Sequence, residues 1–442
     1  MRILSVAAFF LLIGSGISPG LADDLGDCTE GTGDVRIRGC TGVIASGKYG
    51  AGDLADAYVK RGQAYHEIGD TDLALADFDK AIALDPKDAG AYLSRGDTHN
   101  ARSNWDAAID DFSKSLELSP DQALAHNNRG SAYHATGRFD RAIGDFDRAI
   151  ALDPTRASFY FNRGQAHYAQ DSDDKAIADY EKAIELDPLY AIAHHNLGAA
   201  YSNIGDHDRA IATLDKAIEL DPKYALAYHS RGLAHAGKEA YDKAIADYDK
   251  AIELDPEDAD PFRMRGDAYR KTDRLDKAIA DYGRALLLRP RDAGIYHDRG
   301  HSYARKGRFD KAIADYDKAI ALDPMLANAY SNRGFAYYGK GRLTRAIAEY
   351  DKAIKLDARD AFAYNARAWV YFKLGKASSG LPDANRALEL DPENAYALDT
   401  RGHIHEALGR KTKAIADFRA ALKRDPSIRE SRDGLKRLGA SP

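Results

Sequence analysis

The sequence predicts an all-α solenoid, a stack of helical hairpins that each occupy 34 residues. A sixteen-residue stretch recurs along most of the chain, and Tyr241 to Pro256, YDKAIADYDKAIELDP, is a representative copy. The prolines that close these stretches lie 34 residues apart, and Ala358 takes the one place in the series without a proline: Pro86, Pro120, Pro154, Pro188, Pro222, Pro256, Pro290, Pro324, Pro392 and Pro426. A fixed period of this length is typical of helical repeats, which bury apolar surface against their neighbours and need no single large core.

Residues 1–22 have the features of a secretory signal peptide. Arg2 supplies a positive charge, the apolar run from Ile3 to Ile13 is too short to span a bilayer, and small residues precede Ala22. We expect cleavage after Ala22 and export of the mature chain. The alternative is an uncleaved N-terminal membrane anchor.

Residues 23–54 are predicted to form an N-terminal capping half repeat. Cys28 and Cys40 are the only cysteines of the chain, and an oxidising compartment would let them form a disulfide. Such a bond contributes about 2–3 kcal/mol in chain-entropy models. A redox or metal pair is the alternative, but the eleven intervening residues match no CxxC motif. An apolar stripe over residues 34–46 predicts one helix that packs on the first repeat.

Residues 55–428 contain eleven units, each of which begins with alanine and reads as two helices. The first half carries an aromatic residue or histidine at position 4, glycine at position 8 and another ring at position 11, as in Tyr58, Gly62 and Tyr65. The second half carries an aromatic residue at position 24, such as Tyr248, between two alanines. Each set lies on one helical face. Glycine costs a helix about 1 kcal/mol, so position 8 predicts a close approach of the neighbouring helix.

With Arg-Gly at positions 7 and 8, these spacings resemble bacterial tetratricopeptide repeat proteins over residues 55–428. The resemblance implies a right-handed superhelix whose first helices line a concave groove that holds peptides. It therefore implies a protein or peptide partner. The carboxylate clamp of the family looks absent, because no unit has lysine at position 5 and only Arg263 is cationic there.

An ion pair is predicted within each hairpin. Position 7 is arginine in ten units and position 23 is acidic in the same ten, whereas the fifth unit has Leu197 and Thr213 at these positions. We hypothesise that the arginine and the acid pair between the two helices. Independent drift at the two positions is the alternative. Representative pairs are Arg61 with Asp77, Arg231 with Asp247 and Arg299 with Asp315.

The variable face of the first helices is the candidate binding surface. Positions 2, 5, 9 and 12 form a stripe of their own, on which the repeats differ from one another. Early and middle units present polar groups that can hydrogen-bond a peptide backbone, and an ordinary solvated helix face is the alternative. These candidates are Asn127, Asn128, Asn162, His195 and Asn196.

Late units present aromatic rings on the same stripe. Large rings on a groove wall are typical binding anchors. The alternative is that they repack the degenerate tenth unit, in which Ala384 replaces the aromatic residue and Pro382 lies in the second helix. These candidates are Phe335, Tyr338, Phe362, Trp369, Phe372 and Tyr396.

Charge and motifs argue against several classes of function. Charged residues make up 30% of the chain, the net charge is -6 and the signs alternate, so no basic field favours nucleic acid. The histidines largely follow the repeat positions, and no familiar catalytic motif is present. We predict a protein that is not an enzyme and uses no cofactor or metal, with a short capping helix in residues 429–442.

The sequence as a whole predicts an exported scaffold, in a bacterial periplasm, that binds an extended segment of another protein in its concave groove. One alternative is a membrane-tethered assembly factor, whose only membrane contact is an uncleaved N-terminal segment. Another is a histidine-based metal or enzymatic role, for which His195 and His229 would be the residues to mutate.

Overall fold

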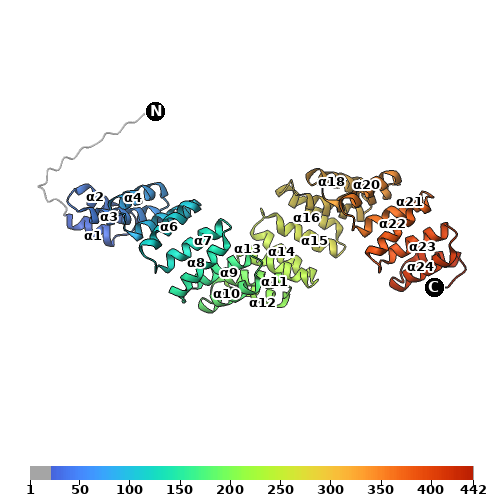
Figure 1. Ribbon diagram of the computed structural model, residues 1–442, viewed down its shortest axis with the longest axis horizontal. Helices are drawn as coiled ribbons and strands as arrows, with labels where there is room; N and C mark the ends of the chain where they lie inside the picture. The colour runs from blue at the N-terminus through green and yellow to red at the C-terminus, as the bar shows by residue number, and fades with distance from the viewer. Residues whose placement is uncertain (1–20, 442) are drawn as a thin grey trace, which may run out of the picture. The chain divides into compact units, whose positions relative to one another are not determined.

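A computed structural model describes residues 21–441, which contain only α-helices and connecting turns (Figure 1). Residues 1–20 of the predicted signal peptide lie outside the described residues. The chain forms two compact units, one up to Ile204 and one from Gly205 onward. The division falls within the fifth repeat, the one whose sequence lacks both the arginine and the acid.

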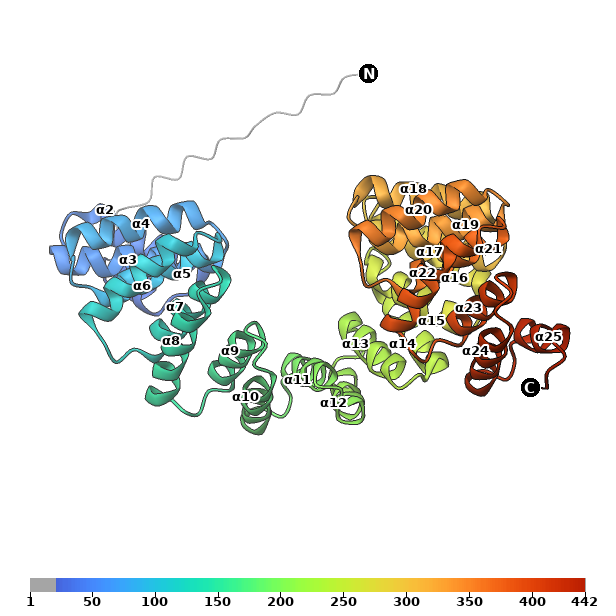
Figure 2. The ribbon, with the colours of Figure 1, turned by 45° about the vertical axis from the view of Figure 1, so that its right-hand side comes forward.

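The helices of the first unit follow one another in pairs (Figure 2). Those from α3 to α10 form four hairpins with the predicted 34-residue period. The bounds are α1 (Leu21–Glu30), α2 (Gly33–Ser46), α3 (Ala51–Glu67), α4 (Thr71–Leu84), α5 (Ala89–Ala101), α6 (Trp105–Leu118), α7 (Ala123–Ala135), α8 (Phe139–Leu152), α9 (Ala157–Tyr168), α10 (Asp173–Leu186) and α11 (Ala191–Asn203).

The second unit begins with one helix, continues with six hairpins and ends in a single short helix. The bounds are α12 (His207–Leu220), α13 (Ala225–Gly237), α14 (Tyr241–Leu254), α15 (Ala259–Lys271), α16 (Leu275–Leu288), α17 (Ala293–Arg305), α18 (Phe309–Leu322), α19 (Ala327–Gly339), α20 (Leu343–Leu356), α21 (Ala361–Lys373), α22 (Ala377–Leu390), α23 (Ala395–Ala407), α24 (Lys411–Arg424) and α25 (Arg429–Arg437).

The glycine at position 8 allows the two helices of a hairpin to meet. A Cβ on Gly62 would lie 2.8 Å from a ring carbon of Phe78, and one on Gly232 would lie 2.5 Å from a ring carbon of Tyr248. The two rings are almost completely buried. Because the ring lies directly on the glycine Cα, no side chain fits there without displacing it. The tenth repeat replaces both partners, with Ala368 and Ala384 in one buried cluster.

The turn inside each hairpin depends on a left-handed residue at position 15. Glycine takes this conformation in most repeats, with φ of 84° at Gly69 and 73° at Gly137. Four repeats place another residue type there, at Ser103, Asp171, Glu239 and Asp273, with φ between 54° and 59°. These four residues carry a local backbone strain that glycine avoids.

The N-terminal cap is a two-helix hairpin and not the single helix expected from the sequence. Cys28 in α1 forms a disulfide with Cys40 in α2, and both side chains are buried. The bond and the apolar Val43 hold α1 against α2, which packs on α3. The repeat pattern did not predict α1, because the sequence of this helix does not match the 34-residue repeat. Helix α3 also begins four residues earlier than expected, at Ala51.

The first helices of successive hairpins contact one another directly within each unit. Helix α3 contacts α5 and α5 contacts α7 in the first unit, and contacts of the same kind link α13, α15, α17, α19, α21, α23 and α25 in the second. Among the described residues, successive second helices make no comparable contact. A stack that is tighter on its first-helix side curves towards that side, so the first helices line the concave surface of each unit.

The chain ends in the capping helix α25, which packs on α23 and α24. Ile428 and Leu435 are buried there, while most of its charged residues are exposed. Pro382 lies inside α22, which continues to Leu390. The degenerate tenth repeat therefore keeps both of its helices.

Candidate functional site

The arginines at position 7 hold the hairpins together. Arg61 donates from Nε to one carboxylate oxygen of Asp77 at 2.7 Å and from Nη2 to the other at 2.9 Å. The corresponding pairs Arg299–Asp315 and Arg231–Asp247 have the same forked geometry. The hydrogen bond to Asp77 raises the pKa of Arg61. These groups satisfy one another between the helices, so their role is structural.

The third nitrogen of this arginine reaches back to the preceding repeat. Arg95 Nη1 donates to Asp79 at 2.6 Å, and Arg163 Nη1 donates to Asp147 at the same distance. Each arginine thereby joins two repeats. The sequence carries a signal for this contact, which the pairing of positions 7 and 23 does not include: an aspartate recurs at position 25 in many units. Arg299 lacks such a partner because Gly283 occupies that position.

The polar candidates of the early and middle repeats bond mainly to one another. Asn127 is buried, accepts from Asn162 Nδ2 at 2.9 Å and donates to Asn128 at 3.0 Å. Asn128 in turn donates to Asp97 at 2.8 Å. These amides form a ladder across α5, α7 and α9, which stabilises the junctions between repeats. These amides therefore already have hydrogen-bond partners within the protein, unlike the free groups that a peptide-binding surface was expected to present.

The hydrogen bonds of the ladder join residues of two repeats, so the periodicity of a single helix does not predict them. Position 5 of one repeat meets position 6 of the next, as Asn127 meets Asn162 and as His297 meets Asn332 at 2.8 Å. A separation of 35 residues between matching polar side chains would have revealed it. Within the fifth repeat, His195 Nδ1 lies 3.0 Å from Asn196 Oδ1.

Asn196 also lines a cavity of about 310 Å³ in the first unit. Its other walls include His134, Tyr168 and Tyr180. Burial raises the pKa of Tyr180 and lowers that of His134, so both are neutral near pH 7. Asn196 is the member of the predicted polar set that lines this cavity.

The aromatic candidates of the late repeats converge on one site in the second unit. Phe335, Phe362 and Tyr396 are exposed by 41%, 47% and 63%. Among the described residues, they are the only aromatic side chains in the set of exposed large apolar groups. All three line a cavity of about 390 Å³. We call this cavity the apolar pocket.

The walls of the apolar pocket come from α19, α21 and α23 and from the start of α25. Val370 and Ile428 supply aliphatic surface, and Tyr338 and Trp369 form one side. Asn365 and Asp399 are the polar groups deeper in the wall. Asp399 is buried, accepts a hydrogen bond from Ser431 at 2.5 Å, and has a pKa raised by burial. A mainly apolar wall with few polar groups is typical of a ligand pocket.

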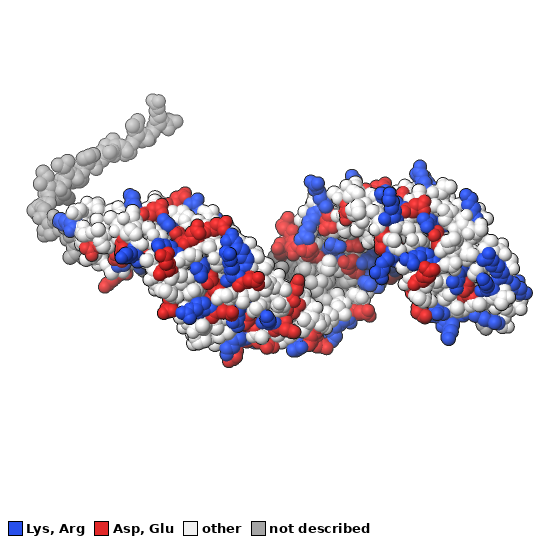
Figure 3. All heavy atoms as spheres, viewed as in Figure 1, with Lys and Arg blue, Asp and Glu red and all other residues white. Residues whose placement is uncertain are grey.

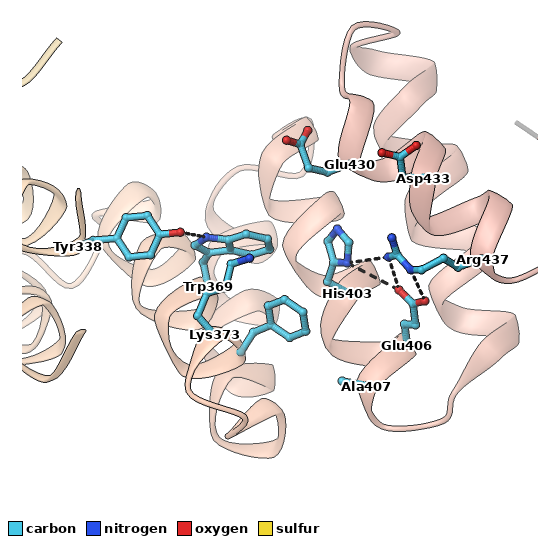
Figure 4. Close-up of a pocket in the computed structure, with 10 residues that line it drawn as sticks. Tyr338, Trp369, Lys373, His403, Glu406, Ala407, Glu430, Asp433 and Arg437 are labelled. Atoms are coloured by element: carbon cyan, nitrogen blue, oxygen red, sulfur yellow. Dashed lines mark hydrogen bonds and ion pairs between the residues drawn. The ribbon is translucent and has the colours of Figure 1, made fainter. Parts of the chain in front are cut away.

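A second cavity of about 680 Å³ shares Trp369 with the apolar pocket, and its lining residues are drawn in Figure 4. We call it the charged pocket. Tyr338, Trp369 and Glu430 line both pockets. The further lining residues are Phe372, Lys373, His403, Glu406, Ala407, Asp433 and Arg437.

Trp369 is fixed between the two pockets. Its indole Nε1 donates to the hydroxyl of Tyr338 at 2.8 Å. Its ring lies 5.2 Å from the ring of Phe372 and 5.6 Å from that of His403, centroid to centroid. The ammonium nitrogen of Lys373 lies 4.5 Å from the centroid of the indole ring. These contacts hold the indole in one orientation, which is the condition for a specific binding wall.

Phe372 differs from the other aromatic candidates, because it packs on the buried cluster of Ala368, Ala384 and Ile404. This ring fills space beside the small residues of the tenth repeat, as the repacking interpretation expects. Phe335, Phe362 and Tyr396 do not fill it, since they remain exposed. The aromatic set of six thus has one member that packs in the tenth repeat, three exposed members, and two partly buried members that line both pockets, Tyr338 and Trp369.

The histidines lie at hairpin contacts. His99, His167 and His235 each place Nε2 at 3.8–3.9 Å from the acid that pairs with the position 7 arginine. Burial lowers the pKa of each of these histidines. No group of three or more metal-ligating side chains occurs among the described residues. None of the described helices combines the length and apolar character that crossing a bilayer requires.

Basic and acidic side chains both occur across the face of the molecule that Figure 3 shows. The net charge of the whole chain is only -6, so the groups that line each pocket dominate its local electrostatics.

Comparison with known proteins identifies the repeats. Models of the TPR repeat match residues 96–137, 130–171, 168–205, 266–307, 300–341 and 336–375. Models of the tetratricopeptide repeat match residues 55–88, 191–224, 225–258, 247–280 and 365–427. A comparison with curated protein sequences finds no match.

Several solved structures are similar. MamA is 32% identical over 38% of this chain and 92% of its own, with a TM-score of 0.36. YrrB, described as a TPR protein with an unusual peptide-binding site, is 31% identical over 42% of this chain and 97% of its own, with a TM-score of 0.39. The Cut9–Hcn1 hetero-tetramer of the APC/C is 15% identical over 92% of this chain and 93% of its own, with a TM-score of 0.50, a likeness of fold alone. Because the repeat models together match most of residues 55–427, the chain belongs to the tetratricopeptide repeat family, whose members are generally non-enzymatic scaffolds that bind protein or peptide partners.

Proposed function

We propose that this protein is an exported scaffold that binds an extended segment of a partner protein on its concave first-helix surface, principally at the apolar pocket. One observation carries the proposal: the exposed aromatic side chains Phe335, Phe362 and Tyr396 share a single cavity. Aromatic side chains bury about 150–250 Å² each on association and dominate interface energies. Their exposure in the free chain is therefore best explained by a partner that covers them.

The geometry favours an extended segment. The pocket walls come from three successive first helices and from the start of α25, so an occupant crosses several helices. Packed helices lie about 8–10 Å apart and an extended chain rises about 3.3 Å per residue, so about three residues span one repeat. A segment of roughly nine residues would cross the three helix-to-helix intervals of this region.

The disulfide supports an exported location. Cys28 and Cys40 are bonded and buried in the N-terminal cap, and such bonds persist in oxidising compartments. Together with the predicted signal peptide of residues 1–22, this favours the bacterial periplasm. Sequencing the N-terminus of the exported protein tests the proposal: a chain that begins after Ala22 supports it, and an intact Met1 favours a membrane-tethered form.

Affinity capture tests the binding site. We expect the full chain to retain a specific protein that Trp369→Ala and Phe362→Ala variants lose. Met325→Ala is the matched control, because Met325 is an exposed large apolar residue of the same unit, at 71%, outside the pocket. Circular dichroism shows whether each variant is folded. Equal capture by all four proteins would rule out the apolar pocket as the site.

A further inference from the structure

We infer that the two pockets together select a segment with a large apolar side chain and, two or three residues away, a lysine or arginine. This inference rests on the proposed peptide-binding function and adds the chemistry of the partner. The apolar residue enters the apolar pocket and the basic residue enters the charged pocket. Tyr338, Trp369 and Glu430 belong to both walls, so the pockets adjoin and one short segment can fill both.

The charged pocket contains carboxylates that the protein itself leaves available. Its charged lining residues are Lys373, Glu406, Glu430, Asp433 and Arg437. Arg437 and Glu406 neutralise each other through two hydrogen bonds of 2.9 Å and 2.7 Å. No hydrogen bond or ion pair to Glu430 occurs among the described residues, and the only ion pair of Asp433 is a loose contact of 3.8 Å with Arg429.

Glu430 and Asp433 act on the same side of α25. They are three residues apart on one helix, so their side chains are neighbours, and Figure 4 shows both beside the cavity. The rings of Trp369 and Phe372 line the same cavity, and aromatic rings attract cations to their faces. An aromatic wall with two carboxylates in the same cavity is a site for a cationic side chain.

The protein's own groups indicate which charge the pocket accepts. The ammonium group of Lys373 lies 4.5 Å from the indole centroid of Trp369 and 5.7 Å from the ring centroid of Phe372, so a cation of the protein already occupies these ring faces and the carboxylates of Glu430 and Asp433 are the groups that attract an incoming one. Arg437 is committed to Glu406, so it is a poor partner for an incoming acid. His403 is 7% exposed, lines the cavity, and its Nε2 has no hydrogen-bond partner among the described residues. The nearest carboxylate oxygen to that nitrogen in an ion-pair contact is that of Asp399, at 3.7 Å.

The spacing of the motif follows from extended-chain geometry. Side chains two residues apart lie on one side of an extended segment, about 7 Å from each other. Because the two pockets share Tyr338, Trp369 and Glu430, a step of two or three residues is enough to reach from one to the other.

Selection from a random dodecapeptide library displayed on phage, with the full disulfide-bonded chain as the target, tests the inference. We expect enriched peptides to carry a large apolar residue and a lysine or arginine two or three positions away. Synthetic copies should bind Glu430→Gln and Asp433→Asn variants about two- to fivefold more weakly, since each substitution removes one carboxylate. A Glu430→Lys variant should select acidic residues in place of basic ones. Glu257→Gln is the control for an exposed carboxylate outside both pockets.

The outcomes separate the inference from the proposed function. Peptides that require Phe362 and Trp369 but show no preference for basic residues would overturn the inference and leave the function intact. Selection that yields no peptide sensitive to Trp369→Ala would overturn the function itself, and the inference with it. Glu430 and Asp433 are exposed, so their variants should fold, and unchanged melting temperatures would show this.

Discussion

Two glycines of the third repeat should respond in opposite ways to the same substitution. Gly130 lies in α7 at position 8, and Gly144 lies in the middle of α8. A Cβ on Gly130 would lie 2.7 Å from a ring carbon of Phe146, whereas a Cβ on Gly144 would meet nothing within 4 Å. Phe146 is 1% exposed and has no free space to enter.

The expected magnitudes follow from this geometry. Alanine is more favourable than glycine in a helix by about 1 kcal/mol, so Gly144→Ala should stabilise the unit by about 0.5–1 kcal/mol. The same gain applies to Gly130→Ala, but a carbon pair normally lies about 3.5–4.0 Å apart, so the ring must move. Overpacking of this kind costs about 1–3 kcal/mol, so the net effect of Gly130→Ala ranges from about zero to a loss of roughly 2 kcal/mol.

Urea unfolding followed by circular dichroism compares the variants, and hydrogen exchange of the α7 and α8 amides localises the effect to the repeat. Repeating the Gly130→Ala substitution in a Phe146→Ala variant makes the test sharper. Phe146→Ala costs about 3–5 kcal/mol because it leaves a cavity. In that background the ring is gone, so Gly130→Ala should stabilise by about 1 kcal/mol. The tenth repeat already has this combination in Ala368 and Ala384.

The double-mutant cycle therefore has an expected coupling of about 1–3 kcal/mol between Gly130 and Phe146, which equals the cost of overpacking. If Gly130→Ala destabilises the repeat equally with and without the ring, steric contact with Phe146 is not the reason for glycine at position 8. If it stabilises the wild-type repeat as Gly144→Ala does, the close approach of the two helices is wrong.

Three further predictions concern the repeats. Gly283→Asp should be more stable than the near-isosteric Gly283→Asn by about 0.5–1 kcal/mol, because it supplies the carboxylate that Arg299 lacks; thermal melts should show the difference shrink in high salt, and a salt-independent difference would contradict an ion pair. Glu239→Gly should stabilise the second unit by about 0.5–1 kcal/mol, because glycine adopts the left-handed φ of 57° without strain. If Glu239→Ala is as stable as Glu239→Gly, backbone strain is not the cause. Burial lowers the pKa of His301 from its usual 6.5 to about 4, so the unfolded chain binds this proton first and stability falls as pH drops from 6.5 towards 4; urea unfolding at a series of pH values should give a shallower decline for His301→Gln, and an unchanged slope would show that the group does not contribute.

The sequence by itself determined the fold, because its signals are local. A 34-residue period, one apolar stripe per helix and a glycine opposite an aromatic residue each describe a single hairpin or its contact with the next, and the hairpin is the unit that repeats. The pairing of Arg61 with Asp77 was open to the same reasoning, since both residues belong to one hairpin and vary together.

The tertiary structure decided which variable side chains are available to a partner. Asn127 and Phe362 belong to the same predicted stripe, yet Asn127 is buried against the next repeat and Phe362 is exposed in the apolar pocket. Exposure depends on how closely helices of different repeats approach, which the periodicity of one helix does not encode. The charged pocket could not be predicted from the repeat pattern, because Glu430 and Asp433 come from a capping helix outside the repeat period. Only the folded chain brings them to the same pocket as Trp369.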